Sequence, residues 1–279
     1  MIVQAASGTQ DASLAAGISW LRKLGNAAVD LLFPPTCVGC QRYGAWLCRE
    51  CMSQIERIQP PVCAVCGWPG ERPAPGSAAH HRCRGGVCCQ SASAHLDGMR
   101  AFAFHSGPLR EAIHQLKYND LQALAPPLGN LMAAGWSALA PENSDFDAIV
   151  PIPLHRTRQR QRGYNQSALL ARELARHLQR PVIEDSLVRI RATAPQVDLN
   201  AQARQENVRD AFRCVSRNLS GKRVLLIDDV CTTGATLEAA SSALRAGGAS
   251  SVWAYTLARA RGQGRPGLWE STKESGKWN

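Results

Sequence analysis

The hydrophobic pattern of the chain changes near residue 95. Beyond that point, short apolar runs alternate with stretches that are apolar on one side of a helix. Such alternation of strands and helices favours an α/β fold whose parallel sheet is covered on both faces. The pattern predicts strands over 99–104, 147–153, 224–227 and 252–257, and helices over 108–118, 127–139, 165–179 and 236–246.

The first third of the chain has a different composition and a different hydrophobic pattern. Apolar residues at helical spacing between Ser13 and Leu32 predict an amphipathic helix, ended by Pro34 and Pro35, that docks on protein and does not cross a bilayer. Residues 36–90 are rich in Cys, Gly, Pro and Arg and have no periodic apolar pattern long enough to form a hydrophobic core. A segment of this kind needs a bound metal ion or cross-links to be stable. Four parts are therefore expected: a tail and helix over 1–35, a cysteine-rich module over 36–92 with a mobile loop at 71–87, an α/β domain over 93–260 and a disordered tail over 261–279.

The net charge of the chain indicates which classes of partner to expect. Lys and Arg total 32 against 22 Asp and Glu, a net charge of +10, which favours nucleotides or nucleic acid without choosing between them. A basic surface with no specific partner is the alternative. The first ten residues carry no secretory signal, and no apolar stretch is long enough to span a bilayer. A reducing cytoplasmic location is the expectation.

Nine of the eleven cysteines lie between residues 37 and 89, many in C-x-x-C pairs. This clustering is typical of structural Zn²⁺ and not of a disulfide framework. An all-cysteine set leaves no open position for catalysis. One ion could take the first two pairs, or an interleaved arrangement could place Cys37, Cys40, Cys63 and Cys66 together. The candidate ligands are Cys37, Cys40, Cys48, Cys51, Cys63, Cys66, Cys83 and Cys88.

A candidate phosphate site follows the strand predicted over 224–227. Asp228 and Asp229 end the strand, and a loop of small residues with Cys231 in its middle leads into a helix. The helix N-terminus offers free N–H groups to an anion, and small residues let the backbone approach it. The two carboxylates suit the hydroxyls of a ribose, with Mg²⁺ beside them to neutralise a pyrophosphate. The proposed phosphate-binding residues are Thr232, Thr233, Gly234, Ala235 and Thr236, and no Gly-Lys-Ser/Thr of a Walker A loop is present.

The run IDDVCTTGAT resembles the PRPP-binding signature of type I phosphoribosyltransferases. That resemblance implies a Rossmann-like parallel-sheet domain that binds PRPP, or a related ribose phosphate, together with Mg²⁺. Its chemistry would be displacement of pyrophosphate at C1 of the ribose, which needs orientation of the substrate and stabilisation of the leaving group. No general base stands out, so catalytic residues and the acceptor are not assigned.

A second segment carries four arginines within seven residues, from Arg156 to Arg162, followed by Gly163. Guanidinium groups match phosphate oxygens, so Arg156, Arg162 and Gly163 are candidates for a pyrophosphate-binding loop. A solvated charged face is the alternative. The pattern P-x-P-L-x-x-x-R-x-R-x-R-G-Y-N-Q here, GPLREAIHQLKY at 107–118 and PQ-x-x-L-x-x-x-x-R-x-x-NVR at 195–209 are together similar to motifs of the ComF family.

The ComF resemblance covers about residues 30 to 260 and implies a double zinc ribbon before the phosphoribosyltransferase domain. It also implies a flexible loop that closes over PRPP, with Gln196, Arg204 and Asn207 in it, and Lys117 as a further phosphate contact or a surface lysine.

The function that the resemblance implies is natural competence, with single-stranded DNA and other competence proteins as partners. Trp46, Trp68 and Tyr164 are the candidates for stacking on bases. Two alternatives stay open: a metabolic phosphoribosyltransferase acting on a nucleobase-like acceptor, and a PRPP sensor or adaptor without turnover.

Overall fold

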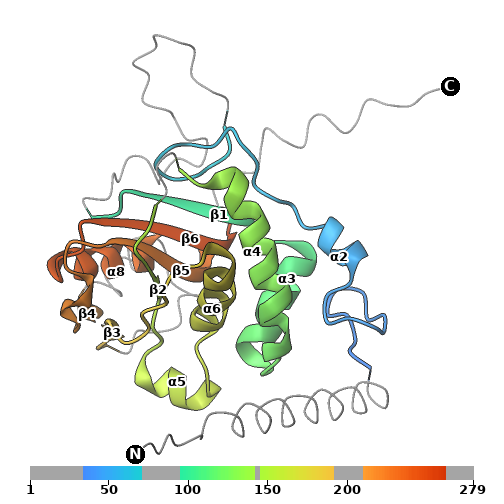
Figure 1. Cartoon of the computed structure of the whole chain (residues 1–279). Coiled ribbons are helices and arrows are strands. Elements are labelled where there is room, and N and C mark those ends of the chain that lie inside the picture. Colours follow the sequence, from blue (N-terminus) through green and yellow to red (C-terminus); the bar gives the residue numbers. More distant parts are fainter. Residues whose placement is uncertain (1–33, 71–94, 142–144, 192–209, 262–279) are drawn as a thin grey trace, which may run out of the picture.

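The computed structural model describes residues 34–70, 95–141, 145–191 and 210–261 (Figure 1). The predicted N-terminal helix, the loop at 71–87 and all but the first residue of the C-terminal tail lie outside these residues. The described elements, in chain order, are α2 (Arg49–Ser53), β1 (Gly98–Phe104), α3 (Gly107–Tyr118), η1 (Gln122–Leu124), α4 (Ala125–Leu139), β2 (Ala148–Pro151), α5 (Arg156–Arg162), α6 (Gln166–Leu178), β3 (Leu187–Arg189), β4 (Phe212–Cys214), η3 (Arg217–Leu219), β5 (Arg223–Cys231), α8 (Ala235–Ala246) and β6 (Ser251–Arg259).

The main sheet is parallel and has the strand order β1-β6-β5-β2. Its carboxyl ends therefore share one edge, where ligands bind in open α/β sheets. β3 and β4 form a separate antiparallel pair. The α/β fold class with a parallel sheet is confirmed. No helix in the described part of the chain is long and apolar enough to cross a membrane.

Helices cover both faces of the sheet (Figure 1). Successive side chains of a strand point to opposite faces, so Leu225 and Ile227 of β5 pack in one core cluster with α3, α4 and α6. Val224 and Leu226 pack in a second cluster with α8 and the β3–β4 pair. This two-sided burial explains why β5 is an almost continuous apolar run.

The cysteine-rich segment is built onto the free edge of β1. The Ile58 N–H donates to the Phe102 carbonyl at 2.9 Å, and the Phe104 N–H donates to the Glu56 carbonyl at 2.9 Å. The buried Arg100 of β1 donates to the carbonyl of Ala64 at 2.9 Å. Residues 34–70 and the sheet therefore share backbone hydrogen bonds as well as the core cluster that contains Cys37 and Cys51.

Two predicted elements differ from the structure. β5 does not end at Ile227 but runs through both acids to Cys231, because it stays paired with β6 as far as Arg259. The arginine-rich segment is not a loop: it is the helix α5, capped by the His155 side chain and ended by Gly163 with φ 80°. Arg and Gln favour helix, and nothing in the segment breaks the pattern before that glycine.

Candidate functional site

Two buried acids stand at the carboxyl end of β5. Asp228 is 9% exposed and Asp229 is 3% exposed. The hydroxyl of Ser167, in the first turn of α6, donates to Asp228 Oδ1 at 2.9 Å. The backbone N–H of Asp229 donates to the same oxygen at 2.9 Å. Asp228 is thereby fixed in place by β5 and α6 together.

Asp229 is paired with Lys117, near the end of α3. The Lys117 Nζ lies 2.8 Å from Asp229 Oδ1, while Asp229 Oδ2 is buried without a hydrogen-bond partner. A buried carboxylate oxygen normally has a partner. The free oxygen therefore fits a ligand that brings a hydroxyl donor or a cation, as the hydroxyls of a ribose or Mg²⁺ would.

The pKa of Asp228 is raised to about 7, first by its burial and then by the negative charge of Asp229. The positive charge of Lys117 and the hydrogen bonds from Ser167 and the Asp229 N–H act in the opposite direction. Two adjacent carboxylates in a buried site repel each other, and a strongly shifted carboxyl beside a cleft is typical of a functional site.

The residues from Thr232 to Thr236 link β5 to α8. Gly234, with φ 83°, sits at the N-cap of α8 and offers no side-chain cap. The first N–H groups of this twelve-residue helix therefore face the carboxyl edge of the sheet, although Thr233 Oγ1 accepts one of them, from Ala235, at 3.4 Å. Helix N-termini of this kind bind phosphate. Cys231 is not mid-loop, as the sequence suggested, but is the buried last residue of β5.

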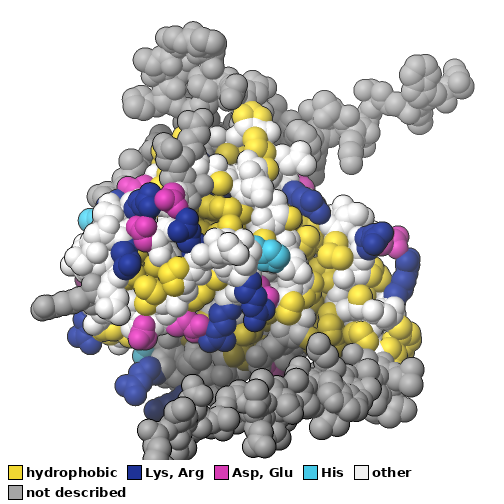
Figure 2. Space-filling view, in the orientation of Figure 1, with side chains coloured by type: hydrophobic (Ala, Val, Ile, Leu, Met, Phe, Trp, Pro, Cys, Tyr) yellow, Lys and Arg dark blue, Asp and Glu magenta, His cyan; other side chains and the backbone are white. Residues whose placement is uncertain are grey.

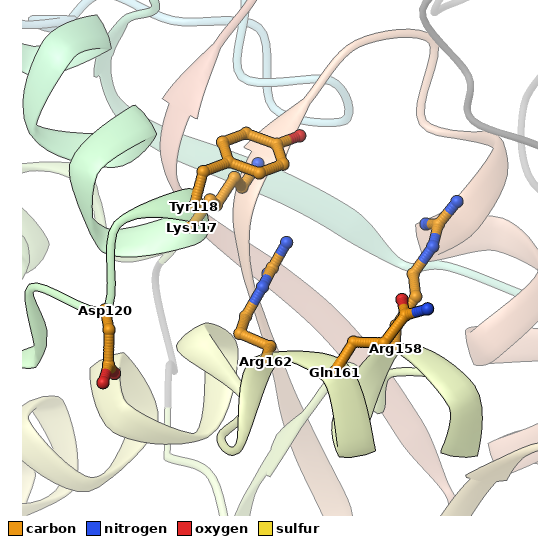
Figure 3. Close-up of a pocket in the computed structure, with 6 residues that line it drawn as sticks. All are labelled: Lys117, Tyr118, Asp120, Arg158, Gln161 and Arg162. Atoms are coloured by element: carbon orange, nitrogen blue, oxygen red, sulfur yellow. The ribbon is translucent and has the colours of Figure 1, made fainter.

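A cavity of about 390 Å³ lies between the end of α3 and α5 (Figure 3). Arg162 and Arg158 reach into it from α5, and Lys117 and Tyr118 from α3, while Asp120 is turned away from the two arginines. Of the proposed pyrophosphate-binding residues, Arg162 lines this cavity, Gly163 caps α5, and the exposed Arg156 is not among the lining residues.

The remaining loop candidates, Gln196, Arg204 and Asn207, lie outside the described residues. They belong to the segment that connects β3 to β4. Arg189, the last residue of β3, is buried over the ring of Phe212 at 5.3 Å. Burial and the charge of Arg158 lower the pKa of Arg189, and the charge of Asp228 opposes this. That segment therefore begins directly after a buried arginine whose pKa responds to the charges of both α5 and Asp228.

Four cysteines converge at the start of the described chain. The sulfur atoms of Cys37, Cys40, Cys48 and Cys51 all lie within 4.8 Å of one another, and the sulfurs of Cys40 and Cys48 are 3.6 Å apart. Thiolates about 2.3 Å from a tetrahedral zinc have this spacing. Burial opposes ionisation of Cys37, but N–H groups of Cys48, Cys40 and Gly39 outweigh it and lower the pKa of its thiol to about 6. The set supports structural zinc.

The interleaved arrangement of Cys37 and Cys40 with Cys63 and Cys66 is wrong. The helix α2 begins directly after Cys48 and brings Cys51 back toward the first pair. Cys63 and Cys66 lie instead beside the sheet, where Arg259 of β6 donates to the Cys66 carbonyl. Cys83 and Cys88 lie outside the described residues.

Sequence reasoning passed over several residues of the site. Ser167 follows the Arg-Gly-Tyr-Asn-Gln run, and its position in the first turn of α6 was the available signal. Lys117 is a candidate from the sequence, either as a phosphate contact or as a surface lysine, and its side chain is only 20% exposed because it lies over Asp229. Tyr118 carried no signal in the sequence, because its exposure depends on how α3 meets α5.

Comparison with known protein families gives two matches along the chain. A phosphoribosyl transferase domain matches residues 165–274, and a double zinc ribbon domain matches residues 28–91. Competence protein F of Haemophilus influenzae is 32% identical over 218 residues, which cover 77% of this chain and 90% of that protein. This chain belongs to the ComF family.

Two further relatives are similar over most of the ComF chain. The DNA utilization protein YhgH of Escherichia coli K12 is 31% identical over 237 residues, 82% of this chain and 99% of that protein. Competence protein ComFC of Bacillus subtilis is 27% identical over 222 residues, 76% of this chain and 84% of that protein. Among solved structures, a glutamine PRPP amidotransferase of B. subtilis matches with a TM-score of 0.33 and 21% identity over 48% of this chain and 26% of that one.

Proposed function

We propose that this ComF protein binds PRPP with Mg²⁺ at the carboxyl edge of its sheet and acts in the uptake and use of DNA. The second part of the proposal rests on the relatives, whose names are competence protein F and DNA utilization protein. The gathering of four cysteines as a zinc set supports a reducing cytoplasmic compartment.

The observation that carries PRPP binding is the buried Asp228–Asp229 pair beside the N-terminus of α8. A phosphate on the N–H groups that follow Gly234 would place a ribose over β5, where Asp229 Oδ2 has no partner. The pyrophosphate would then face Lys117 and the arginines of α5 that line the cavity. Mg²⁺, when bound, would neutralise the pyrophosphate oxygens.

In this arrangement the protein's own groups orient the ribose and stabilise the leaving pyrophosphate. Asp228 and Asp229 accept hydrogen bonds from the ribose hydroxyls, which fixes the sugar. Arg162 and Lys117 supply positive charge where charge develops on the departing oxygens, and such preorganised charge is the main source of rate enhancement in this chemistry. Pyrophosphate release on addition of an acceptor would favour a transferase, and PRPP binding without release would favour a sensor.

Replacing Asp229 with Asn is expected to weaken PRPP–Mg²⁺ binding about a hundredfold, because a charged acceptor in a buried site is lost. Isothermal titration calorimetry with PRPP and Mg²⁺ measures this. Asp147→Asn is the matched control: Asp147 pairs with Arg223 at 3.0 Å at the opposite edge of the same sheet, so its loss should leave the affinity unchanged. Equal affinity in wild type and Asp229→Asn would contradict the proposed site, and so would failure of the wild type to bind.

A further inference from the structure

None of the aromatic side chains first considered for base stacking has a largely exposed ring. Tyr164 is buried, and its hydroxyl donates to the Leu116 carbonyl. The Trp68 ring packs edge-on against Phe104 with centroids 5.7 Å apart and lies under the guanidinium of Arg259. Trp46 packs against the main core cluster. Any stacking platform in the described part of the chain must lie elsewhere.

Among the described residues, two tyrosines are largely exposed. Tyr43 is 76% exposed and Tyr118 is 63% exposed. The cation next to Tyr43, Arg42, forms an ion pair with Glu50 at 2.5 Å. Tyr118 instead has the guanidinium of Arg162 5.4 Å from its ring centroid and the ring of His114 at 4.9 Å. Of these two tyrosines, Tyr118 is the one that combines an exposed aromatic face with cations that face a cavity.

The groups around Tyr118 form a row along α3. Arg110, His114 and Tyr118 are exposed and follow at intervals of four residues, so they lie on one side of the helix. The row leads into the cavity lined by Arg158 and Arg162, whose volume of about 390 Å³ lies within the range of small-ligand sites. Figure 2 shows Lys and Arg side chains over α5 at the lower edge of this face.

The acidic groups nearby are turned away from the two arginines or paired with another cation. Asp120 is turned away from the arginines (Figure 3) and accepts a hydrogen bond from Gln122 at 2.9 Å. Asp229, the other carboxylate near the cavity, is held by Lys117 at 2.8 Å. The surface therefore presents guanidinium groups and one aromatic face together, which is the combination that binds single-stranded nucleic acid without regard to sequence.

We infer that the α3–α5 surface binds single-stranded DNA, with one base stacked on Tyr118 and the neighbouring phosphates held by Arg110 and Arg158. This inference rests on the proposed role in DNA use, and it names the site and the chemistry of the partner. The bound strand enters the cavity beside Lys117, so DNA and the pyrophosphate end of PRPP meet at adjacent positions.

The test measures the affinity of the full chain for a short fluorescent oligo(dT) by fluorescence anisotropy. Tyr118→Ala is expected to bind about tenfold more weakly, as loss of stacking on one base predicts. Tyr118→Trp should bind as tightly as wild type. Tyr43→Ala is the matched control, because it removes an equally exposed tyrosine beside a neutralised arginine, and it should leave the affinity unchanged.

An abasic oligonucleotide of the same length separates stacking from charge. It keeps every phosphate but offers no base, so wild type and Tyr118→Ala should bind it equally, at the affinity of Tyr118→Ala for oligo(dT). Arg158→Gln should flatten the dependence of affinity on salt, since fewer counterions are released.

The binding results separate failure of the α3–α5 surface from failure of the proposed function. If wild type binds oligo(dT) and Tyr118→Ala binds it equally well, the α3–α5 surface is overturned as the site while the proposed function stands. If wild type binds no single-stranded DNA, both this inference and the DNA part of the proposed function fail. A melting temperature and circular dichroism spectrum of Tyr118→Ala that match wild type show that the variant is folded, and calorimetry with PRPP–Mg²⁺ on the wild type judges the PRPP site separately.

Discussion

Asp228→Asn is expected to make the ligand-free protein more stable at neutral and alkaline pH, although Asp228 lies in the centre of the proposed site. The carboxylate is buried next to Asp229, and these two effects raise its pKa to about 7. A shift from about 3.9 to about 7 corresponds to roughly 4 kcal/mol. Asn keeps the oxygen that accepts from Ser167 and the Asp229 N–H but carries no charge.

The stability difference between Asp228→Asn and wild type is expected to grow as the pH rises. A carboxyl with a raised folded-state pKa holds its proton in the native state, so its contribution to stability is complete below about pH 4 and is lost as pH rises through about 7. The advantage of Asp228→Asn should therefore be small at about pH 5 and full at about pH 8. The charged groups around Asp228, which are Asp229, Lys117 and Arg189, are the same in both proteins.

Thermal unfolding of both proteins across this pH range, followed by circular dichroism, measures the difference. A variant that is less stable than wild type at about pH 8, or whose advantage does not grow with pH, would show that Asp228 is ionised without strain. The expected result has a functional meaning: the protein keeps a destabilising charge because the bound ligand, with its cation and hydroxyl donors, needs it.

Removal of zinc is expected to lower the free energy of unfolding by at least about 5 kcal/mol, which is roughly 10–20 °C in melting temperature. The reason is the place of the thiol cluster in the fold. Cys37 is fully buried and, with Cys51, belongs to the same core cluster as Leu109 and Ile113 of α3. Without the ion, four thiols stay in this core with nothing to hold them together.

Zinc content by mass spectrometry and melting curves before and after treatment with a chelator measure this effect. Cys51→Ser should reproduce the loss, and restored zinc should reverse it only in wild type. Cys214→Ser is the control, since Cys214 of β4 lies away from the cluster, on the other face of the sheet. An unchanged melting temperature after complete zinc removal would show that packing alone holds residues 34–70 on the sheet.

Features that lie within one continuous segment of the chain could be predicted from the sequence. The alternation of apolar runs and amphipathic stretches predicted the α/β class, since strand and helix periods differ. The C-x-x-C spacing predicted zinc because two cysteines at that separation already fit one ion. The run from Ile227 to Thr236 indicated a phosphate loop because strand end, small residues and helix start are contiguous there.

Contacts between segments that are far apart in the sequence became clear only in the tertiary structure. Lys117 and Ser167 meet the two acids of β5 only because the strand order β1-β6-β5-β2 places α3 and α6 on the same face. The grouping of the first four cysteines depended on how α2 turns back. The packing of Trp68 against Phe104 and the burial of Tyr164 depended on how the zinc-binding segment and α6 pack. A residue type and its local period fix the conformation of a segment, but the neighbours of a side chain across the fold follow from sheet order and helix packing, which no single stretch of sequence specifies.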